Sequence, residues 1–261
     1  MQGKLIIHCG VQKTGSTSLH HFLQKNRDRL AAVADIHVPT KGSAMRALGR
    51  AAMQFSLNPK KEPQLVDAIA DMRAQMKAGT TVLSHENLPG AMMGKGGVVT
   101  LYPQIERIIS LLDQGFAPLR PHYVIYTRDM AGWKTSVYNQ AVRSDHYTHS
   151  RARFLQDTDH CGDWQSLQAR MVWAAGADRV SVFRLEDEPD LTRPGRQLLH
   201  MVGLDTAGWR ALAPLAGRSN PSLNAGALEF LRLINGLGLN KPDRTRVADL
   251  VADNQSLFVS G

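Results

Sequence analysis

Short apolar runs alternate along this chain with longer stretches of helical periodicity. The runs with the length and composition of β-strands cover residues 4–9, 36–38, 80–84, 122–127 and 179–183. Between two of these runs, apolar residues recur every three or four positions and so share one helical face, namely Tyr102, Ile105, Ile109 and Leu112. Strands that alternate with amphipathic helices predict a mostly parallel sheet covered on both faces. We therefore expect a three-layer α/β/α fold.

The same periodicity predicts helices elsewhere. Residues 62–78 follow a helical pattern that stops before Gly79, and glycine commonly ends a helix. Residues 223–234 and 244–251 are expected to form C-terminal helices. With 261 residues, of which 43% are hydrophobic, the chain can build one sizeable core, and two small domains are also compatible with this length. We interpret residues 1–261 as a single domain.

Composition narrows the class of protein. The formal net charge of +8 attracts anions but leaves nucleic acid, a membrane surface and a phosphorylated cofactor open. Because the basic residues are dispersed and not interleaved with aromatic side chains, we expect no nucleic-acid partner. The only two cysteines, Cys9 and Cys161, form no C-x-x-C pair. No signal-like start or long apolar window occurs, so we expect a cytoplasmic protein without a membrane span.

A polar loop follows the first predicted strand. Residues 6–19 read Ile-Ile-His-Cys-Gly-Val-Gln-Lys-Thr-Gly-Ser-Thr-Ser-Leu, which is typical of a strand, a glycine-bounded turn and the start of a helix. Such a turn points backbone N–H groups and a helix N-terminus at one spot, which suits a phosphate group. In the Walker pattern G-x-x-x-x-G-K-[ST], Gly10 and Gly15 match, but Ser16 stands where the lysine belongs. The lysine lies inside the loop, at Lys13; taken alone, the loop also fits a plain strand-to-helix turn.

A second pair of polar residues follows the predicted strand at 122–127. Arg128 comes directly after this strand, and Ser136 lies eight positions later in a helix predicted to begin near Met130. Side chains at the carboxyl ends of parallel strands project to the crevice where α/β sheets bind ligands. Arginine suits phosphate because its planar fork donates two parallel hydrogen bonds. Taken alone, both residues also fit an ordinary surface role.

Taken together, the two motifs resemble those of the sulfotransferases that use 3'-phosphoadenosine 5'-phosphosulfate (PAPS). The resemblance rests on Lys-Thr-Gly-Ser-Thr at residues 13–17 and on the interval from Arg128 to Ser136, and it covers about residues 4–140. It implies a P-loop NTPase-like sulfotransferase fold of the bacterial type. It also implies an enzyme that transfers a sulfuryl group from PAPS to a hydroxyl or amine acceptor by in-line displacement. The product would be 3'-phosphoadenosine 5'-phosphate (PAP).

The resemblance assigns roles to the motif residues. Lys13 corresponds to the catalytic lysine that contacts the bridging oxygen of the leaving group. Ser16 and Thr17 correspond to ligands of the 5'-phosphate. Arg128 and Ser136 correspond to ligands of the 3'-phosphate. The expected cofactor-binding residues are Gln12, Lys13, Thr14, Gly15, Ser16, Thr17, Ser18, Arg128, Ser136 and Arg218.

Two of these residues depart from the family pattern, and a third lies outside the two motifs. Gln12 replaces the proline usual in the family, and Ser18 replaces a tryptophan that stacks on adenine in the cytosolic members. Arg218 precedes a predicted helix, like the loop with which many sulfotransferases close over the 3'-phosphate. A helix cap at Asn220 or Ser222, with Arg218 solvated, is the alternative interpretation.

Sulfuryl transfer also needs a base that takes the proton of the acceptor. His85 and Glu86 follow each other at the end of the predicted strand at 80–84, so only one faces the crevice while the chain stays extended. By resemblance, cytosolic sulfotransferases use a histidine here, whereas carbohydrate and tyrosylprotein sulfotransferases use a glutamate. We favour Glu86 because of the Ser-x-Glu-Asn arrangement and keep His85 as the alternative. A capping or ion-pairing role for Glu86 is a third interpretation.

The sequence also bears on the partners and on alternative functions. The expected acceptor is a small molecule or a carbohydrate, bound near residues 90–102 and 133–147. Three histidines and a cysteine between residues 146 and 161 match no familiar zinc spacing, so we expect no metal. Alternative functions are a P-loop nucleotide or adenylylsulfate kinase, against which the displaced lysine counts, and a non-catalytic PAP-binding or basic nucleic-acid-binding protein.

Overall fold

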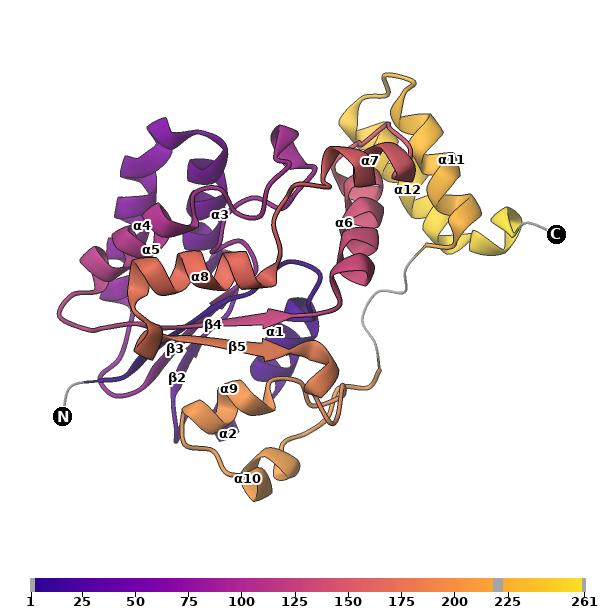
Figure 1. Cartoon of the computed structure of the whole chain (residues 1–261). Coiled ribbons are helices and arrows are strands. Elements are labelled where there is room, and N and C mark those ends of the chain that lie inside the picture. The colour runs from indigo at the N-terminus through magenta and orange to yellow at the C-terminus, as the bar shows by residue number, and fades with distance from the viewer. Residues whose placement is uncertain (1–2, 218–222, 260–261) are drawn as a thin grey trace. The chain divides into compact units, whose positions relative to one another are not determined.

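Five parallel strands form one sheet at the centre of the structure, a computed structural model that describes residues 3–217 and 223–259 (Figure 1). The sheet has the order β2-β3-β1-β4-β5, and all its pairings are parallel. Its strands are β1 (Leu5–Cys9), β2 (Asp35–His37), β3 (Thr81–His85), β4 (His122–Thr127) and β5 (Val180–Arg184). Each begins within one residue of its predicted start, so the prediction of an α/β fold around a parallel sheet is confirmed.

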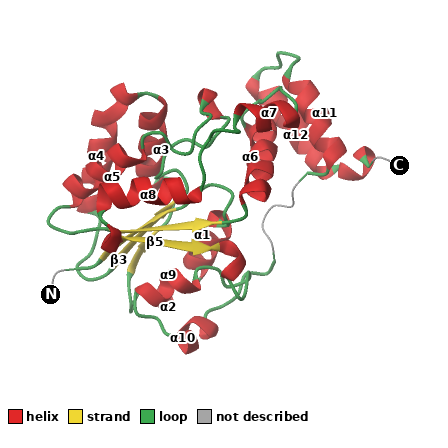
Figure 2. Ribbon diagram, viewed as in Figure 1, coloured by secondary structure: helices red, strands yellow, loops and turns green. Residues whose placement is uncertain are grey.

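Helices cover both faces of this sheet, and Figure 2 shows the strands as a layer between them. One face carries α1 (Ser16–Lys25), α2 (Arg27–Leu30), α9 (Arg196–Met201) and α10 (Thr206–Ala211). The other carries α3 (Ala44–Leu57), α4 (Glu62–Ala74), α5 (Ile105–Phe116) and α8 (Trp164–Ala175). On the first face, Ile6 and Val124 of the sheet pack against Phe22 of α1 and Leu198 of α9. The expected three-layer α/β/α arrangement is therefore present.

The chain divides into two compact units. Unit 1 comprises Met1–Met92, Leu101–Arg128 and Gly162–Ser219, and it contains the sheet with the eight helices named above. Unit 2 comprises Met93–Thr100, Asp129–Cys161 and Asn220–Gly261. Its helices are α6 (Met130–Ser144), α7 (Arg151–Asp157), α11 (Ala225–Asn235) and α12 (Lys241–Asp253). The expectation that residues 1–261 form a single domain therefore stays a prediction.

Buried polar contacts hold the helices of unit 2 together. Arg244 of α12 is 3% exposed and donates to Oδ1 of Asn235 in α11 and to the carbonyl of Val142 in α6. Asn235 itself donates to the same Val142 carbonyl and to that of Tyr147. Each buried polar group thereby finds partners, which a stable interior requires. The predicted C-terminal helices are both present, as α11 and α12.

One helix boundary departs from its prediction. α4 ends at Ala74, whereas the periodicity predicted a helix up to residue 78. Gly79 lies instead in the turn that precedes β3, with a positive φ of 107° that glycine adopts readily. A Cβ atom on Gly3 would lie 2.5 Å from the carbonyl oxygen of Gly79, so two backbone segments meet closely there. Within residues 3–217 and 223–259, no helix combines the length and apolar character needed to cross a bilayer.

Candidate functional site

The loop between β1 and α1 is held against the end of β3. The backbone N–H of Gly10 donates to the carbonyl of His85 at 3.1 Å. A Cβ atom at Gly10 would lie 2.8 Å from Oγ of Ser16 and 3.1 Å from Cα of Glu86, so the close approach requires glycine. Lys13 follows with φ of 66°, a left-handed conformation unusual for a residue with a side chain. A left-handed residue within a turn is typical of the backbone concavities that bind anions.

The loop leads directly into the N-terminus of α1. Gly15 precedes the helix in a left-handed conformation with φ of 89°, and no described side chain caps the helix. The N–H of Leu19 donates to the carbonyl of Gly15 at 3.0 Å. No acidic side chain lies in the first turn, so the positive end of the helix dipole faces the loop. This end of α1 therefore suits an anion.

The predicted ligands of the loop differ in exposure. Lys13 and Thr17 are exposed, Ser18 is half-buried, and Thr14 and Ser16 are buried. The hydroxyl of Thr14 donates to the carbonyl of Val11 at 2.6 Å, and that of Ser16 to the same carbonyl at 3.3 Å. These two hydroxyls brace the loop from inside. Their proposed contacts with a 5'-phosphate stay predictions.

Gln12 anchors the loop to the segment after β3. Its Nε2 donates to Oδ1 of Asn87 at 3.0 Å and to the carbonyl of Gly90 at 3.1 Å. Its Oε1 accepts from the hydroxyl of Tyr102 at 2.5 Å. The side chain is thus engaged inside the protein, and only its backbone remains for a ligand of the loop. These contacts fix the course of the loop at Gln12.

Arg128 lies against the same loop. It follows β4, which pairs directly with β1, and its Nη1 donates to the carbonyl oxygen of Lys13 at 3.3 Å. Its own carbonyl accepts from the indole N–H of Trp164 at 2.7 Å. From β1 the chain continues to β2 on one side of the sheet, and from β4 to β5 on the other, so the two strand ends flank a topological switch point. Ligands of α/β sheets bind at such points.

The other two predicted 3'-phosphate ligands lie elsewhere in the chain. Ser136 occupies the second turn of α6 in unit 2, where Asp129 caps the helix by accepting from Gly132 N–H at 2.7 Å. Its part in a phosphate site stays a prediction. Arg218 lies outside the described residues, and its role stays a prediction as well.

The two candidate bases differ in environment. His85 is 4% exposed, and its Nδ1 accepts a hydrogen bond from the N–H of Asn87 at 3.0 Å. Its ring packs on Gly49 of α3, where a Cβ atom would lie 2.2 Å from the imidazole. Burial lowers the pKa of His85, against an opposing effect of Glu86 and with a smaller contribution from Arg46. The Glu86 side chain is 34% exposed, so it is the more solvent-accessible of the two. The choice of Glu86 over His85 as the base stays a prediction.

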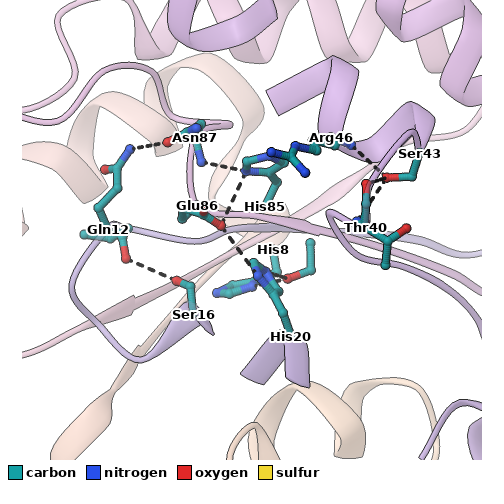
Figure 3. A network of polar contacts seen from close by, with 12 residues as sticks. His8, Gln12, Ser16, His20, Thr40, Ser43, Arg46, His85, Glu86 and Asn87 are labelled. Atoms are coloured by element: carbon teal, nitrogen blue, oxygen red, sulfur yellow. Dashed lines mark hydrogen bonds and ion pairs between the residues drawn. The ribbon is translucent and has the colours of Figure 1, made fainter. Parts of the chain in front are cut away.

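A chain of buried polar side chains, which the sequence analysis did not identify, continues from Glu86 (Figure 3). Oε2 of Glu86 lies 3.5 Å from Nδ1 of His20 in α1, and also 3.5 Å from Nδ1 of His85. His20 Nε2 lies 3.0 Å from Oγ of Ser84 in β3, and the same Oγ lies 2.7 Å from Nδ1 of His8 in β1. One signal was visible: His8 and Ser84 are polar residues inside two strands whose residues are all buried.

No family model, curated protein or solved structure matches this chain. The interpretation of the site therefore rests on its own geometry. Among residues 3–217 and 223–259, no three His, Cys, Asp or Glu side chains are grouped to hold a metal ion.

The buried histidines make the fold sensitive to acid. Burial lowers the pKa of His8 to about 3, and burial likewise lowers that of His20 to about 3 against the opposing effect of Glu86. In the unfolded chain both titrate near the ordinary value of 6.5, so between these values the unfolded state binds more protons. The free energy of unfolding should therefore fall with falling pH in this window, by about 1.4 kcal/mol per pH unit for each histidine.

Chemical denaturation between about pH 6 and about pH 4 measures this slope. His8→Phe removes one titrating group and should reduce the slope by about one proton equivalent. The same slope in the parent and the variant would contradict a neutral, buried His8.

Proposed function

We propose that this protein is a PAPS-dependent sulfotransferase. The observation that carries the proposal is the contact of Arg128 with the backbone of Lys13, because it brings the arginine after β4 and the loop after β1 together at one edge of the sheet. PAPS carries phosphate groups at its 3' and 5' positions, so it needs two anion-binding sites at the same edge of the sheet. The uncapped N-terminus of α1 supports the first, and the Arg128 guanidinium supports the second.

The chemistry assigns one task to each residue. PAPS supplies the sulfuryl group: its sulfur bonds to the acceptor oxygen or nitrogen while the bond to the 5'-phosphate oxygen breaks, and PAP leaves with the electron pair. Lys13 stabilises the negative charge that develops on that oxygen, together with the positive end of α1. Glu86 takes the proton of the acceptor. The loops after β1 and β3, which hold these two residues, are joined by the hydrogen bond from Gly10 to His85.

The acceptor and the compartment belong to the same proposal. A half-exposed carboxylate base suits a hydroxyl or amine on a small molecule or carbohydrate, and a screen with labelled PAPS over phenols, sugars, amines and lipids identifies it. We propose the cytoplasm as the compartment, since the sequence has only two cysteines, Cys9 and Cys161, far apart and without a C-x-x-C pair, as is usual for proteins in reducing conditions.

Ligand titration tests the function before any acceptor is known. Calorimetry should detect saturable binding of PAP, with weaker binding of ADP and no specific binding of generic duplex DNA. An assay with ATP and Mg²⁺ over nucleoside and adenylylsulfate acceptors tests the kinase alternative, in which a lysine at the position of Ser16 is expected. Phosphoryl transfer, or binding of DNA in preference to PAP, would reject the proposal.

Substitution of Arg128 should distinguish the two phosphates. Arg128→Ala is expected to weaken binding of PAP by roughly 10-fold to 100-fold, since a hydrogen bond to a charged group contributes about 1.5–3 kcal/mol. Adenosine 5'-phosphosulfate has no 3'-phosphate, and its affinity should change much less. Calorimetric titration of both ligands measures the difference.

Arg120→Ala is the matched control. This exposed arginine lies just before the start of β4, whereas Arg128 follows its end, so its loss removes one positive charge away from the loop after β1. Its affinity for PAP should stay that of the parent protein. Equal losses for both nucleotides in Arg128→Ala would place Arg128 away from the 3'-phosphate.

A further inference from the structure

The chain of polar side chains that continues from Glu86 is buried at its His8 end and exposed to solvent at its Glu86 end. His8 is 1% exposed, Ser84 is 0% exposed and His20 is 7% exposed, whereas the Glu86 side chain is 34% exposed. The chain joins two strands and a helix, because His8 and Ser84 stand opposite each other in the register of β1 and β3 and His20 lies one turn after the start of α1. Buried polar groups of this kind need a consistent set of donors and acceptors.

The Ser84 hydroxyl lies between His8 and His20 and couples the tautomers of these two histidines. The Ser84 hydroxyl has one proton, and the two imidazoles are its only side-chain partners among the described residues, so this proton is used only if Ser84 donates to one imidazole and accepts from the other. Either His8 Nδ1–H donates to Ser84 and Ser84 donates to His20 Nε2, or the direction is reversed throughout. The direction therefore decides which nitrogen of His20 carries its proton.

The carboxylate of Glu86 selects one of these two directions. Nδ1 of His85 already accepts from the N–H of Asn87, so the neutral His85 offers no proton to Glu86. The remaining neighbour is Nδ1 of His20, at 3.5 Å from Oε2. A proton on this nitrogen favours the carboxylate, and Nε2 then accepts from Ser84.

The surroundings of His8, at the buried end of these polar side chains, agree with this direction of hydrogen bonding. If His8 donates to Ser84 through Nδ1, its Nε2 carries only a lone pair. The His8 Nε2 atom is buried without a hydrogen-bond partner among the described residues. In the reverse direction this atom would carry an N–H group in an apolar surrounding, and a buried donor without an acceptor is the rarer arrangement in folded proteins.

We infer that His20 is a positioning residue for Glu86: its Nδ1–H orients the carboxylate, and Ser84 with His8 fixes its tautomer. The inference rests on the proposed function, in which Glu86 is the base. Oε2 is then held from inside the protein, which leaves Oε1 to take the proton of the acceptor. A base whose carboxylate cannot rotate loses less orientational freedom in the transition state.

Two substitutions of His20 place an amide nitrogen at different points. In His20→Asn the side-chain nitrogen stands where Nδ1 stood and can still donate to Glu86. In His20→Gln it stands where Nε2 stood and faces Ser84 instead. Loss of an orienting partner typically costs about 10-fold to 100-fold in activity, so we expect that loss in kcat for His20→Gln. His20→Asn should retain turnover within about threefold, and KM for PAPS should stay unchanged in both variants.

His21→Asn is the matched control, because this histidine is exposed on the same helix and should leave kcat unchanged. Thermal unfolding of all three variants shows whether differences in turnover follow stability. Equal losses in kcat for His20→Asn and His20→Gln, or no loss in either, would overturn the inference.

Nitrogen NMR of histidine-labelled protein separates this inference from the proposed function. At neutral pH, His20 should be neutral with its proton on Nδ1, and this signal should change in Glu86→Ala. A protein that carries this tautomer but transfers no sulfuryl group would reject the function and keep the geometry. Sulfuryl transfer by a protein in which His20 carries its proton on Nε2 would reject the positioning role and keep the function.

Discussion

Lys13→Ala is expected to reduce turnover by roughly 10²-fold to 10³-fold, the usual loss when one charge contact made in the transition state is removed. Lys13 lies in a loop whose backbone is fixed by the hydrogen bonds of Thr14 and Gln12, so its removal should leave the loop intact. Binding of PAP should therefore weaken far less than turnover. Single-turnover kinetics with labelled PAPS, beside calorimetric titration of PAP, measures both quantities.

Lys25→Ala serves as the control for Lys13→Ala. Lys25 lies at the opposite end of α1, where its ammonium group donates to the carbonyl of Pro214 at 2.7 Å. The control has the same net charge as the test variant and should keep its turnover. Unchanged turnover in Lys13→Ala would remove Lys13 from the mechanism, and equal losses of PAP affinity and turnover would make it a binding residue only.

The sheet could be predicted from sequence because its strands are short apolar runs bounded by polar residues. β4 is the clearest case, since five of its six residues are buried and its predicted bounds are those observed. The end of α4 could not be predicted. The N–H of Lys77 donates to Oδ2 of Asp35 at 3.1 Å, which draws the chain out of the helix toward β2. This contact spans 42 residues, so local periodicity does not contain it.

The candidate site likewise has residues that the sequence could identify and residues that it could not. Lys13 and Arg128 could be proposed from sequence because each follows a strand, and parallel strands end at one edge of the sheet. The role of Gln12 could not, because its side-chain partners are Asn87, Gly90 and Tyr102, 75 to 90 residues away. Motif spacing therefore predicts which groups lie at one edge of the sheet better than it predicts which groups hold the loop in place.

The polar chain behind Glu86 depends on two geometric facts at once. His8 meets Ser84 only through the register of β1 with β3, and His20 meets both Ser84 and Glu86 only through the rotation of α1 about its axis. Neither is encoded in a local pattern. The exposed end of this chain is nevertheless the residue that the sequence favoured as the base, so the two lines of reasoning lead to the same carboxylate.

Glu86→Gln should therefore reduce kcat by roughly 10²-fold to 10⁴-fold, the range expected for loss of a general base, with PAP affinity unchanged. Glutamine keeps the shape and an oxygen acceptor for His20, so a loss of turnover reports the missing base rather than a collapsed site. His85→Asn is the decisive comparison, because its side-chain oxygen can still accept from the N–H of Asn87 while the imidazole is gone. If Glu86 is the base, folded His85→Asn retains most of its turnover. Turnover that survives Glu86→Gln and disappears in His85→Asn would reverse the assignment.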